Sequence, residues 1–342
     1  MRMTFCILTV TILFAVICCK KENDLTSFAQ DRIPESEKAA TTISTSGFDG
    51  VNWADPRDNY VDGYVIPSGL TSSMTYSECQ TYGGKIIDGF IVNMGANTVR
   101  MPVNPSTVSG TWWSGYTGAI DIASSRGMKV ILACWEGTAA KDGKIDNTTS
   151  FWNMWSIITT KYVGNSNVYF EIFNEPFGYT LTDWGNICAQ WLANYPAIPR
   201  GRILVGGFGY DENVTGMGAD SRFSDCLLSQ HIYTWWGNYK TESQWAAELK
   251  RRVGSYYNRT ILTEYGATMT TGKIYTTAKK DAEICFIRAI TNQIRTWGMG
   301  SCYWPGLRNG DTYSIQSLNT GNYTMTTTNA SGLTRIKWGW GL

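Results

Sequence analysis

Residues 168–176 read VYFEIFNEP, a short apolar run that ends in an amide, a carboxyl group and a proline. Its first six residues, Val168 to Phe173, have the length and apolar character of a buried parallel strand. Polar residues directly after such a strand lie at its carboxyl end, where β/α barrels form their active sites. The stretch therefore predicts both a strand and a position for chemistry.

Similar runs recur along the chain. We expect eight strands, at Phe48 to Trp53, Thr98 to Met101, Lys129 to Cys134, Val168 to Phe173, Ile203 to Gly206, Leu228 to Tyr233, Thr260 to Glu264 and Gly300 to Trp304. Helical patterns lie between them, at Tyr76 to Met94, Ala119 to Arg126, Thr149 to Tyr162, Thr182 to Asn194, Glu242 to Val253 and Lys279 to Trp297. After the fifth strand, Gly206-Gly207-Phe208-Gly209 predicts a loop. This alternation predicts the α/β class and a single (β/α)8 TIM barrel over residues 47–342.

Composition limits the class of partner. Twenty-nine basic and 28 acidic residues leave a net charge of +1, which provides no electrostatic footprint for nucleic acid. We therefore expect an uncharged or weakly charged partner and a monomeric protein. The single histidine, His231, nearly excludes a zinc or iron site built on histidines, and we expect no cofactor. The chain has 15 Trp and 19 Tyr; we expect most of these rings to pack in the core and some to be exposed platforms that stack on sugar.

The N-terminus has the pattern of a processed leader. Residues 1–19 combine Arg2, an apolar run over 5–17 and the pair Cys18-Cys19, which resembles a bacterial lipoprotein signal peptide. The charged residues that follow are similar to the export tails of Bacteroidetes surface lipoproteins, and residues 20–46 are expected to be a flexible tether. We expect a lipid-anchored outer-membrane protein, at the cell surface or in the periplasm. Lipidation at either cysteine, or a plain secretory signal, remains open.

Six further cysteines are widely spaced, and several lie in apolar contexts. We expect most of them to be buried free thiols, with one disulfide as the open alternative; they are Cys79, Cys134, Cys188, Cys226, Cys285 and Cys302.

Several of the predicted strands end on polar or aromatic residues. These residues are Arg100, Asn174, Glu175, His231, Tyr233, Glu264 and Trp304. Unpaired charges at the ends of buried strands would cost several kcal/mol, so these groups should pair with one another across the end of the barrel.

Two carboxyl groups across a barrel suit glycoside cleavage. One carboxylic acid must protonate the glycosidic oxygen, while an ionised carboxylate faces the oxocarbenium-like transition state. If the second group attacks directly, the two stand about 5–5.5 Å apart and the anomeric configuration is retained. Glu175 and Glu264 follow strands four and seven, which lie across the barrel from each other.

Five short motifs carry a resemblance to a known family. They are Ala96-Asn97-Thr98-Val99-Arg100-Met101-Pro102, Ile172-Phe173-Asn174-Glu175-Pro176, His231-Ile232-Tyr233, Leu262-Thr263-Glu264-Tyr265-Gly266 and Tyr303-Trp304. In this order and at barrel spacing they resemble glycoside hydrolase family 5, a family of cellulase-like retaining hydrolases. Each motif is weak alone, whereas five in order are specific, and the resemblance runs from about Gly47 to Trp304.

The resemblance implies a role for each matched residue. Glu175 would be the acid/base and Glu264 the nucleophile. Arg100 would hold Glu264 ionised, because a nearby cation lowers a carboxyl pKa, and Tyr233 would hydrogen-bond the same group. Among the other matched residues, Asn174 would bind the sugar 2-hydroxyl, His231 would lie beside the substrate or Glu175, and Trp304 would form the floor of the cleavage subsite. A purely structural role is the alternative for Arg100, His231, Tyr233 and Trp304.

Other residues are expected to bind substrate with less support, among them Trp53 at the end of the first strand. The family's strand-three histidine is absent, so Trp135 or Glu136 takes its place. The loop after Trp53, which contains Asp58, is either a salt-bridged loop or a wall that contacts sugar hydroxyls, and a calcium site there is a weaker alternative. Tryptophan pairs at 112–113 and 235–236 fall just after strands two and six, which makes Trp113 and Trp236 candidate sugar platforms.

These observations predict a retaining glycoside hydrolase acting on a polysaccharide or its oligosaccharides. Glucan, mannan, xyloglucan, galactan and furanoside substrates stay open, as does endo against exo action. The alternative is a non-catalytic surface glycan-binding lipoprotein on a barrel scaffold.

Overall fold

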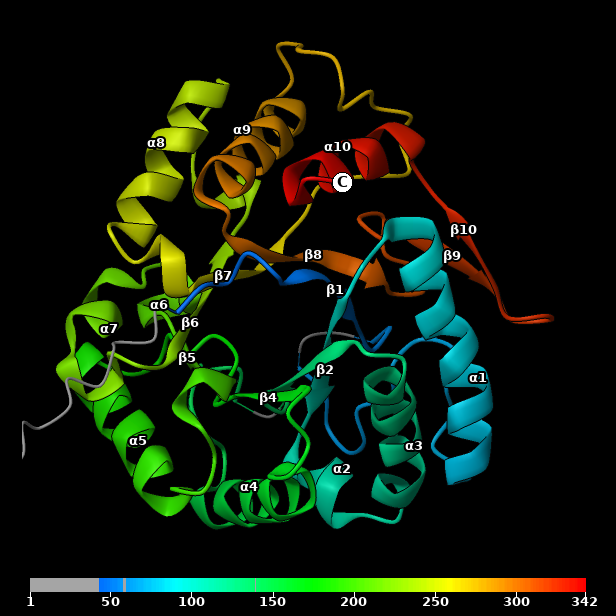
Figure 1. Ribbon diagram of the computed structural model, residues 1–342, viewed down its shortest axis with the longest axis vertical. Coiled ribbons are helices and arrows are strands. Elements are labelled where there is room, and N and C mark those ends of the chain that lie inside the picture. The colour runs from blue at the N-terminus through cyan, green and yellow to red at the C-terminus, as the bar shows by residue number, and fades with distance from the viewer. Residues whose placement is uncertain (1–42, 58–59, 139) are drawn as a thin grey trace, which may run out of the picture. The chain divides into compact units, whose positions relative to one another are not determined.

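The computed structural model describes residues 43–57, 60–138 and 140–342, and in them eight parallel strands close into a barrel (Figure 1). The strands are β1 (Asp49–Trp53), β2 (Thr98–Val103), β3 (Lys129–Cys134), β4 (Val168–Glu171), β5 (Ile203–Gly206), β6 (Leu227–Ile232), β7 (Thr260–Tyr265) and β8 (Gly300–Leu307). Each strand pairs with the next along the chain, and β8 pairs with β1. The expected (β/α)8 TIM barrel is confirmed.

Helices surround the barrel (Figure 1). They are α1 (Tyr76–Gly89), which continues as η1 (Phe90–Met94), α2 (Pro105–Ser109), α3 (Trp112–Ser125), α4 (Thr148–Tyr162), α5 (Leu181–Asn194), α6 (Phe208–Asp211), α7 (Thr215–Ala219), α8 (Glu242–Val253), α9 (Ala282–Trp297) and α10 (Ala330–Trp340). Short 3-10 turns are η2 (Arg200–Arg202), η3 (Ser221–Phe223), η4 (Thr234–Trp236) and η5 (Tyr257–Arg259).

Local sequence explains where the long helices begin and end. Thr75 and Thr241 each cap a helix with a hydroxyl that accepts a backbone N–H, and the residue three positions on caps the threonine in return. Gly95 ends the first helical segment in a left-handed conformation with φ of 71°, as the sequence predicted. Such stops return the chain to the next strand after a short connection.

The barrel interior is built in layers. Toward the amino ends of the strands lies a small apolar cluster, formed by Phe48, Ile131, Leu204, Leu227, Ile261 and Cys302. Above it the inward side chains are polar and hydrogen-bonded to one another, and the larger apolar core lies between strands and helices. A polar layer inside a barrel places charged groups just beneath its carboxyl end.

Three parts of the fold differ from the expected pattern. Helix α3 begins at Trp112, ahead of the expected Ala119, because this segment buries its aromatic and small residues against the barrel. The loop expected after β5 contains the short helices α6 and α7. After β8 the chain adds a two-stranded hairpin, β9 (Gln316–Asn319) with β10 (Thr324–Thr327), and α10, which packs on α9 (Figure 1).

The described residues just before the expected boundary at Gly47 already pack against the barrel. Thr45 is buried, and its hydroxyl donates to the Thr260 carbonyl at 2.9 Å and accepts from the Gly300 N–H at 3.0 Å. The expected signal peptide, and the tether up to residue 42, lie outside the described residues. In the part of the chain that is described, no helix has the length and apolarity to cross a bilayer.

The six cysteines of the folded region are buried free thiols, as expected.

Candidate active site

The carboxyl ends of the strands bring the predicted polar residues together. Arg100 lies on β2, Glu264 on β7 and His231 on β6. Tyr233 directly follows β6, and Asn174 and Glu175 lie three and four residues beyond the end of β4. All are less than a tenth exposed. Such burial requires that every charge find a partner inside the group.

Arg100 is the cation that these carboxyl groups share. Its Nη1 donates to Glu264 Oε1 at 2.5 Å and to Asn52 Oδ1 at 3.0 Å. Its Nη2 donates to Asn174 Oδ1 at 2.6 Å and to Glu171 Oε1 at 2.8 Å, and its Nε donates to Glu171 Oε2 at 2.6 Å. The planar guanidinium thereby fixes four side chains in one plane, which lysine cannot do.

Glu264 is held at both oxygens. Arg100 donates to Oε1, and the Tyr233 hydroxyl donates to Oε2 at 2.7 Å, so the contacts implied for these residues are present. Burial raises the pKa of Glu264, while the charge of Arg100 and the two hydrogen bonds oppose that rise. Its carboxyl group is therefore oriented, and Arg100 and Tyr233 limit the rise of its pKa.

Glu175 has a different environment. Its backbone is left-handed, with φ of 57°, and its N–H donates to Asp211 Oδ2 at 3.0 Å. Burial raises the pKa of Glu175 well above its usual range, the neighbouring Glu264 raises it further, and Arg100 opposes the shift. One carboxyl group is thus favoured as the acid and the other as the carboxylate, which is the division that glycoside cleavage requires.

His231 touches both carboxyl groups. Its Nδ1 is 2.9 Å from Glu175 Oε1 and 3.6 Å from Glu264 Oε2. Burial lowers the pKa of His231 well below its usual range, and the charge of Arg100 lowers it further, so the ring is neutral near pH 7. A neutral ring donates at one nitrogen and accepts at the other.

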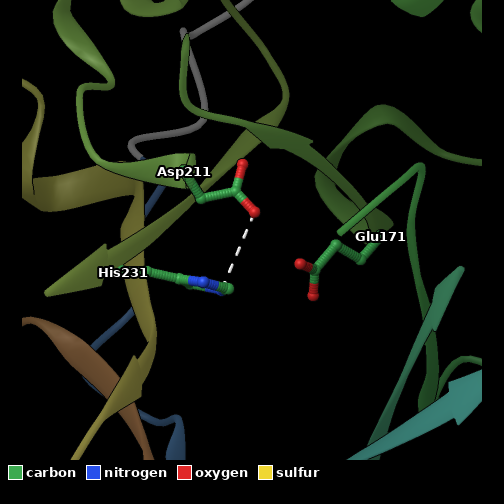
Figure 2. A group of neighbouring side chains, drawn as sticks. All are labelled: Glu171, Asp211 and His231. Atoms are coloured by element: carbon green, nitrogen blue, oxygen red, sulfur yellow. Dashed lines mark ion pairs between the residues drawn. The ribbon is translucent and has the colours of Figure 1, made fainter. Parts of the chain in front are cut away.

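Sequence reasoning missed two buried acids below these residues. Figure 2 shows Glu171, Asp211 and His231 converging from β4, α6 and β6. Glu171 lies inside the run that predicts the fourth strand, and an otherwise apolar run hides it. An acid inside a buried strand indicates that a cation or hydrogen-bond donor is buried beside it. Asp211 follows the glycine-rich stretch after β5, where no periodicity marks an inward side chain.

Two groups of three side chains are close enough to hold a cation. One group is Glu171, Asp211 and His231, and the other is Glu175, His231 and Glu264. Within each group, one ligand atom from each residue lies within 4.8 Å of the others. The oxygens of Glu171 and Glu264 already accept hydrogen bonds from Arg100. The guanidinium therefore supplies the positive charge that a metal ion would otherwise bring.

An aromatic cleft of about 480 Å³ opens beside Glu175. It is lined by Glu175, Tyr210, Tyr233, Trp235, Trp236, Trp304, Arg308, Asp311, Thr312 and Tyr313. Trp235 is 60% exposed and stacks on Tyr233 with 4.2 Å between ring centroids, while Trp236 meets the same ring by its edge. An exposed ring supported by a second ring is a platform for an apolar ligand face. The structure thus places Trp236 and Trp304 in the same cleft as Glu175.

Trp135 and Glu136 lie at a second cavity, of about 210 Å³. The Trp135 ring contacts Trp304 with 5.8 Å between centroids, which places it next to the site. Both carboxyl oxygens of Glu136 instead accept backbone N–H groups, from Asp142 at 2.7 Å and Gly143 at 2.9 Å. Glu136 is therefore an anchor for its own loop, and the structure gives no support for a direct sugar contact.

Two residues that were expected to bind substrate are not in the group. Trp53 is fully buried between β1 and α1, where its Nε1 donates to the Ser68 carbonyl at 2.8 Å and its ring packs on Phe90. Side chains alternate along a strand, and since Asn52 points into the barrel, Trp53 points out. Trp113 lies on α3 rather than in a loop, and its ring packs on Tyr116 and on Tyr162 of α4. Both expectations are wrong for this geometric reason.

The loop after β1 contains an ion pair, in agreement with the expectation of a salt-bridged loop. Arg57 Nη2 lies 2.6 Å from Asp55 Oδ2, and the same oxygen accepts the Ile66 N–H at 2.6 Å. Asp58, the candidate ligand in this loop, lies outside the described residues.

Solved structures with this fold include several cellulases. An endocellulase from Pyrococcus horikoshii, solved with cellotetraose, superposes with a TM-score of 0.61 at 14% identity over 86% of this chain and 92% of that one. Cel5A (EG2) from Hypocrea jecorina gives 0.57 at 18% identity, over 86% and 98%. A cellulase–inhibitor complex gives 0.59 at 16% identity, over 85% and 92%. At these identities the likeness establishes the fold.

A search of curated proteins finds no match. Residues 66–305 match the family model described as cellulase (glycosyl hydrolase family 5), which spans well over half of the chain and includes both glutamates. The chain therefore belongs to glycosyl hydrolase family 5.

Proposed function

We propose that this chain is a retaining glycoside hydrolase that cleaves a polysaccharide or its oligosaccharides through a covalent glycosyl-enzyme. The observation that carries the proposal is the short distance between Glu175 and Glu264. One carboxyl oxygen of Glu175 lies within 4.8 Å of one carboxyl oxygen of Glu264. Retaining enzymes keep the two carboxyl groups about 5–5.5 Å apart, whereas inverting enzymes need about 6.5–9.5 Å to admit a water molecule. The short spacing supports direct attack by one carboxylate.

The first step follows from the two environments. Glu264 Oε attacks the anomeric carbon while Glu175 gives its proton to the glycosidic oxygen, so the C–O bond breaks and the leaving sugar departs as an alcohol. Asn174, whose Oδ1 is held by Arg100, presents its amide N–H to the sugar 2-hydroxyl. Trp304 supports the ring of the sugar that is being cleaved.

The second step uses the same groups in reverse order. Glu175, now ionised, removes a proton from water, and the water oxygen attacks the anomeric carbon and releases Glu264 as a carboxylate. The free glycosyl product keeps the starting configuration, and Glu175 regains its proton. Arg100 and Tyr233 stabilise Glu264 when it leaves.

A β-linked glucan is the first substrate class to test. The cellulases of similar fold act as the precedent, and the exposed Trp235 ring and the half-buried Trp236 ring suit the C–H faces of pyranose sugars. Glu175 lies at the aromatic cleft, so the leaving sugar is expected to rest on those rings.

The test uses two alanine variants and two substrates. Glu264→Ala should abolish hydrolysis of cellotetraose and of dinitrophenyl β-cellobioside. Glu175→Ala should lose hydrolysis of cellotetraose and keep hydrolysis of dinitrophenyl β-cellobioside, because dinitrophenolate departs without a proton. Azide added to Glu264→Ala should restore turnover with an inverted product.

The control is Glu212→Gln, since Glu212 is an acid of the same rim that pairs with Arg252 outside the group. Full activity of either alanine variant on cellotetraose, or of Glu264→Ala on dinitrophenyl β-cellobioside, would overturn the assignment. Binding of glycan by the wild type without hydrolysis of any glycan in a polysaccharide panel would favour the non-catalytic alternative.

We also propose that the protein is exported and anchored by a lipid at Cys18 or Cys19. The support is the sequence pattern of residues 1–19. Growth with labelled palmitate should mark the full chain in the membrane fraction, and the double variant Cys18→Ala/Cys19→Ala should lose the label. A labelled double variant would exclude this anchor.

A further inference from the structure

Asp211 is a fully buried acid that the proposed mechanism does not use. It follows β5 in a left-handed conformation with φ of 52°, and its carboxyl group lies inside the barrel's carboxyl end. Gly206 makes room for it, because a Cβ at that position would overlap the Asp211 carboxyl group. A strained backbone and a glycine matched to one side chain indicate that the position of this carboxyl group matters.

Asp211 faces the acid/base from two sides. Its Oδ2 accepts the backbone N–H of Glu175 at 3.0 Å and lies 3.7 Å from His231 Nε2 (Figure 2). Both Nε2 and the other Asp211 oxygen, Oδ1, are buried without a hydrogen-bond partner among the described residues. Hydrogen bonds at active sites are often long before substrate binds and shorten in the complex.

The surrounding charges favour a neutral Asp211. The ionisable groups that face it are Glu171 and Glu175 from the β4 side, Arg100 on β2, His231 on β6 and Cys188 on α5. Burial raises the pKa of Asp211 well above its usual range, and Glu171 raises it further. Since Arg100 is already bonded to Glu171 and Glu264, one guanidinium serves four buried carboxyl groups.

The protonation state of Asp211 selects the tautomer of His231. A protonated Asp211 Oδ2 hydroxyl donates to Nε2, so the ring proton must be on Nδ1, which then donates to Glu175 Oε1. An ionised Asp211 only accepts, so the ring proton moves to Nε2. In that state Nδ1 becomes an acceptor and takes the hydrogen bond of the Glu175 proton.

We propose that Asp211 is a positioning residue that, while it carries its own proton, holds His231 as the Nδ1–H tautomer and so leaves the Glu175 proton free for the glycosidic oxygen. This inference rests on the proposed acid role of Glu175. Asp211 exchanges no proton with substrate: its proton stays on Oδ2 through both steps, and only the Glu175 proton is transferred. Ionisation of Asp211 at high pH turns the Glu175 proton toward the imidazole and weakens the acid.

Asp211→Asn is the informative variant. The residue at this place must accept the Glu175 N–H and donate to Nε2, and a carboxyl hydroxyl does both with one atom. The amide oxygen of asparagine accepts the Glu175 N–H but cannot donate, so it imitates an ionised Asp211 at every pH. Glu212→Gln on the same loop is the matched control, because its carboxyl group pairs with Arg252 and not with His231.

Nitrogen NMR of the labelled imidazole is the direct test, since His231 is the single histidine of the chain. At neutral pH we expect the proton on Nδ1 in the wild type and in Glu212→Gln, and on Nε2 in Asp211→Asn. A wild-type ring protonated at Nε2, or a ring that keeps Nδ1–H in Asp211→Asn, would overturn the proposal.

Kinetics separate this inference from the proposed function. We expect Asp211→Asn to lower kcat/KM for cellotetraose by about 10²-fold, the lower end of what a general acid contributes, and to leave dinitrophenyl β-cellobioside unchanged. A merely structural role would slow both substrates together, which would exclude the inference while leaving the roles of Glu175 and Glu264 intact. Loss of the proposed function itself would appear instead as full activity in Glu264→Ala.

Discussion

Arg100 and Glu171 form a two-point ion pair inside the barrel, in which Nε donates to Oε2 at 2.6 Å and Nη2 donates to Oε1 at 2.8 Å. Both side chains are buried, and the pair fixes the plane of the guanidinium. The remaining N–H groups of Arg100 can then reach Glu264, Asn174 and Asn52 with fixed geometry. A structural ion pair thereby orients the other side chains of the candidate site.

Arg100→Lys should separate charge from geometry. Lysine keeps one positive charge but cannot donate to four side chains in a plane, so we expect kcat/KM to fall by about 10²-fold. The hydrogen bond from Arg100 lowers the pKa of Glu264 against the effect of burial, so losing that bond in the lysine variant should raise the pKa even though the charge is kept. The acidic limb of the kcat/KM profile should therefore move to higher pH. Arg126→Lys, in the half-exposed pair with Asp88, is the control and should change neither quantity.

The alkaline limb should depend on the leaving group. Burial and Glu264 raise the pKa of Glu175, so the acid keeps its proton near neutrality and loses it as the pH rises. We expect kcat/KM for cellotetraose to fall on the alkaline side, while the value for dinitrophenyl β-cellobioside stays level because its leaving group needs no proton. Parallel pH profiles of the two substrates check this. An equal alkaline fall for both would assign the limb to another group.

The fold was predictable because the strands of the barrel are short and buried and are separated from one another by turns. The expected strand at Lys129 to Cys134 matches β3 residue for residue, and Glu242 to Val253 matches α8. Parallel strands covered on both faces leave a continuous apolar signal that turns interrupt. The hairpin β9–β10 and α10 follow no such repeat, so alternation alone could not predict them.

The site was predictable where residues follow strand ends and not where they depend on side-chain direction. Glu175 and Glu264 lie at the ends of two clear strands, so their convergence follows from the barrel. Trp53 points away from the site because it alternates with the inward-pointing Asn52 on the same strand, as period-two alternation requires. Asp211 reaches the site through a left-handed backbone next to glycines, and such a path leaves no periodic signal.

Asp49 should make the protein less stable above its folded pKa. Burial raises the pKa of this carboxyl group from 3.8 to about 6, against the opposing charge of Lys129. Its contribution to folding is complete below 3.8 and is lost as the pH rises through 6, because the unfolded state releases the proton first.

Asp49→Asn should therefore raise the free energy of unfolding at pH 8 by about 1 kcal/mol, a value reduced because water reaches part of the side chain. At a pH near 3.5 the variant and the wild type should be equal. Chemical denaturation at both pH values measures the two differences. A stabilisation of the same size at both would exclude ionisation as its cause.

Alanine substitution at Trp53 and at Trp235 should distinguish a tryptophan that packs in the core from one that binds substrate. Trp53→Ala removes a fully buried ring and should lower the free energy of unfolding by about 3–5 kcal/mol. Trp235→Ala removes a ring that is 60% exposed at the cleft, so stability should change by less than about 0.5 kcal/mol. Its KM for cellotetraose should rise by about tenfold, equivalent to about 1.4 kcal/mol of lost stacking.

Denaturation curves and steady-state kinetics on both variants give the comparison. A Trp53→Ala protein of normal stability and raised KM would return Trp53 to the substrate site, because a ring that packs only between β1 and α1 cannot act on binding without first weakening the fold.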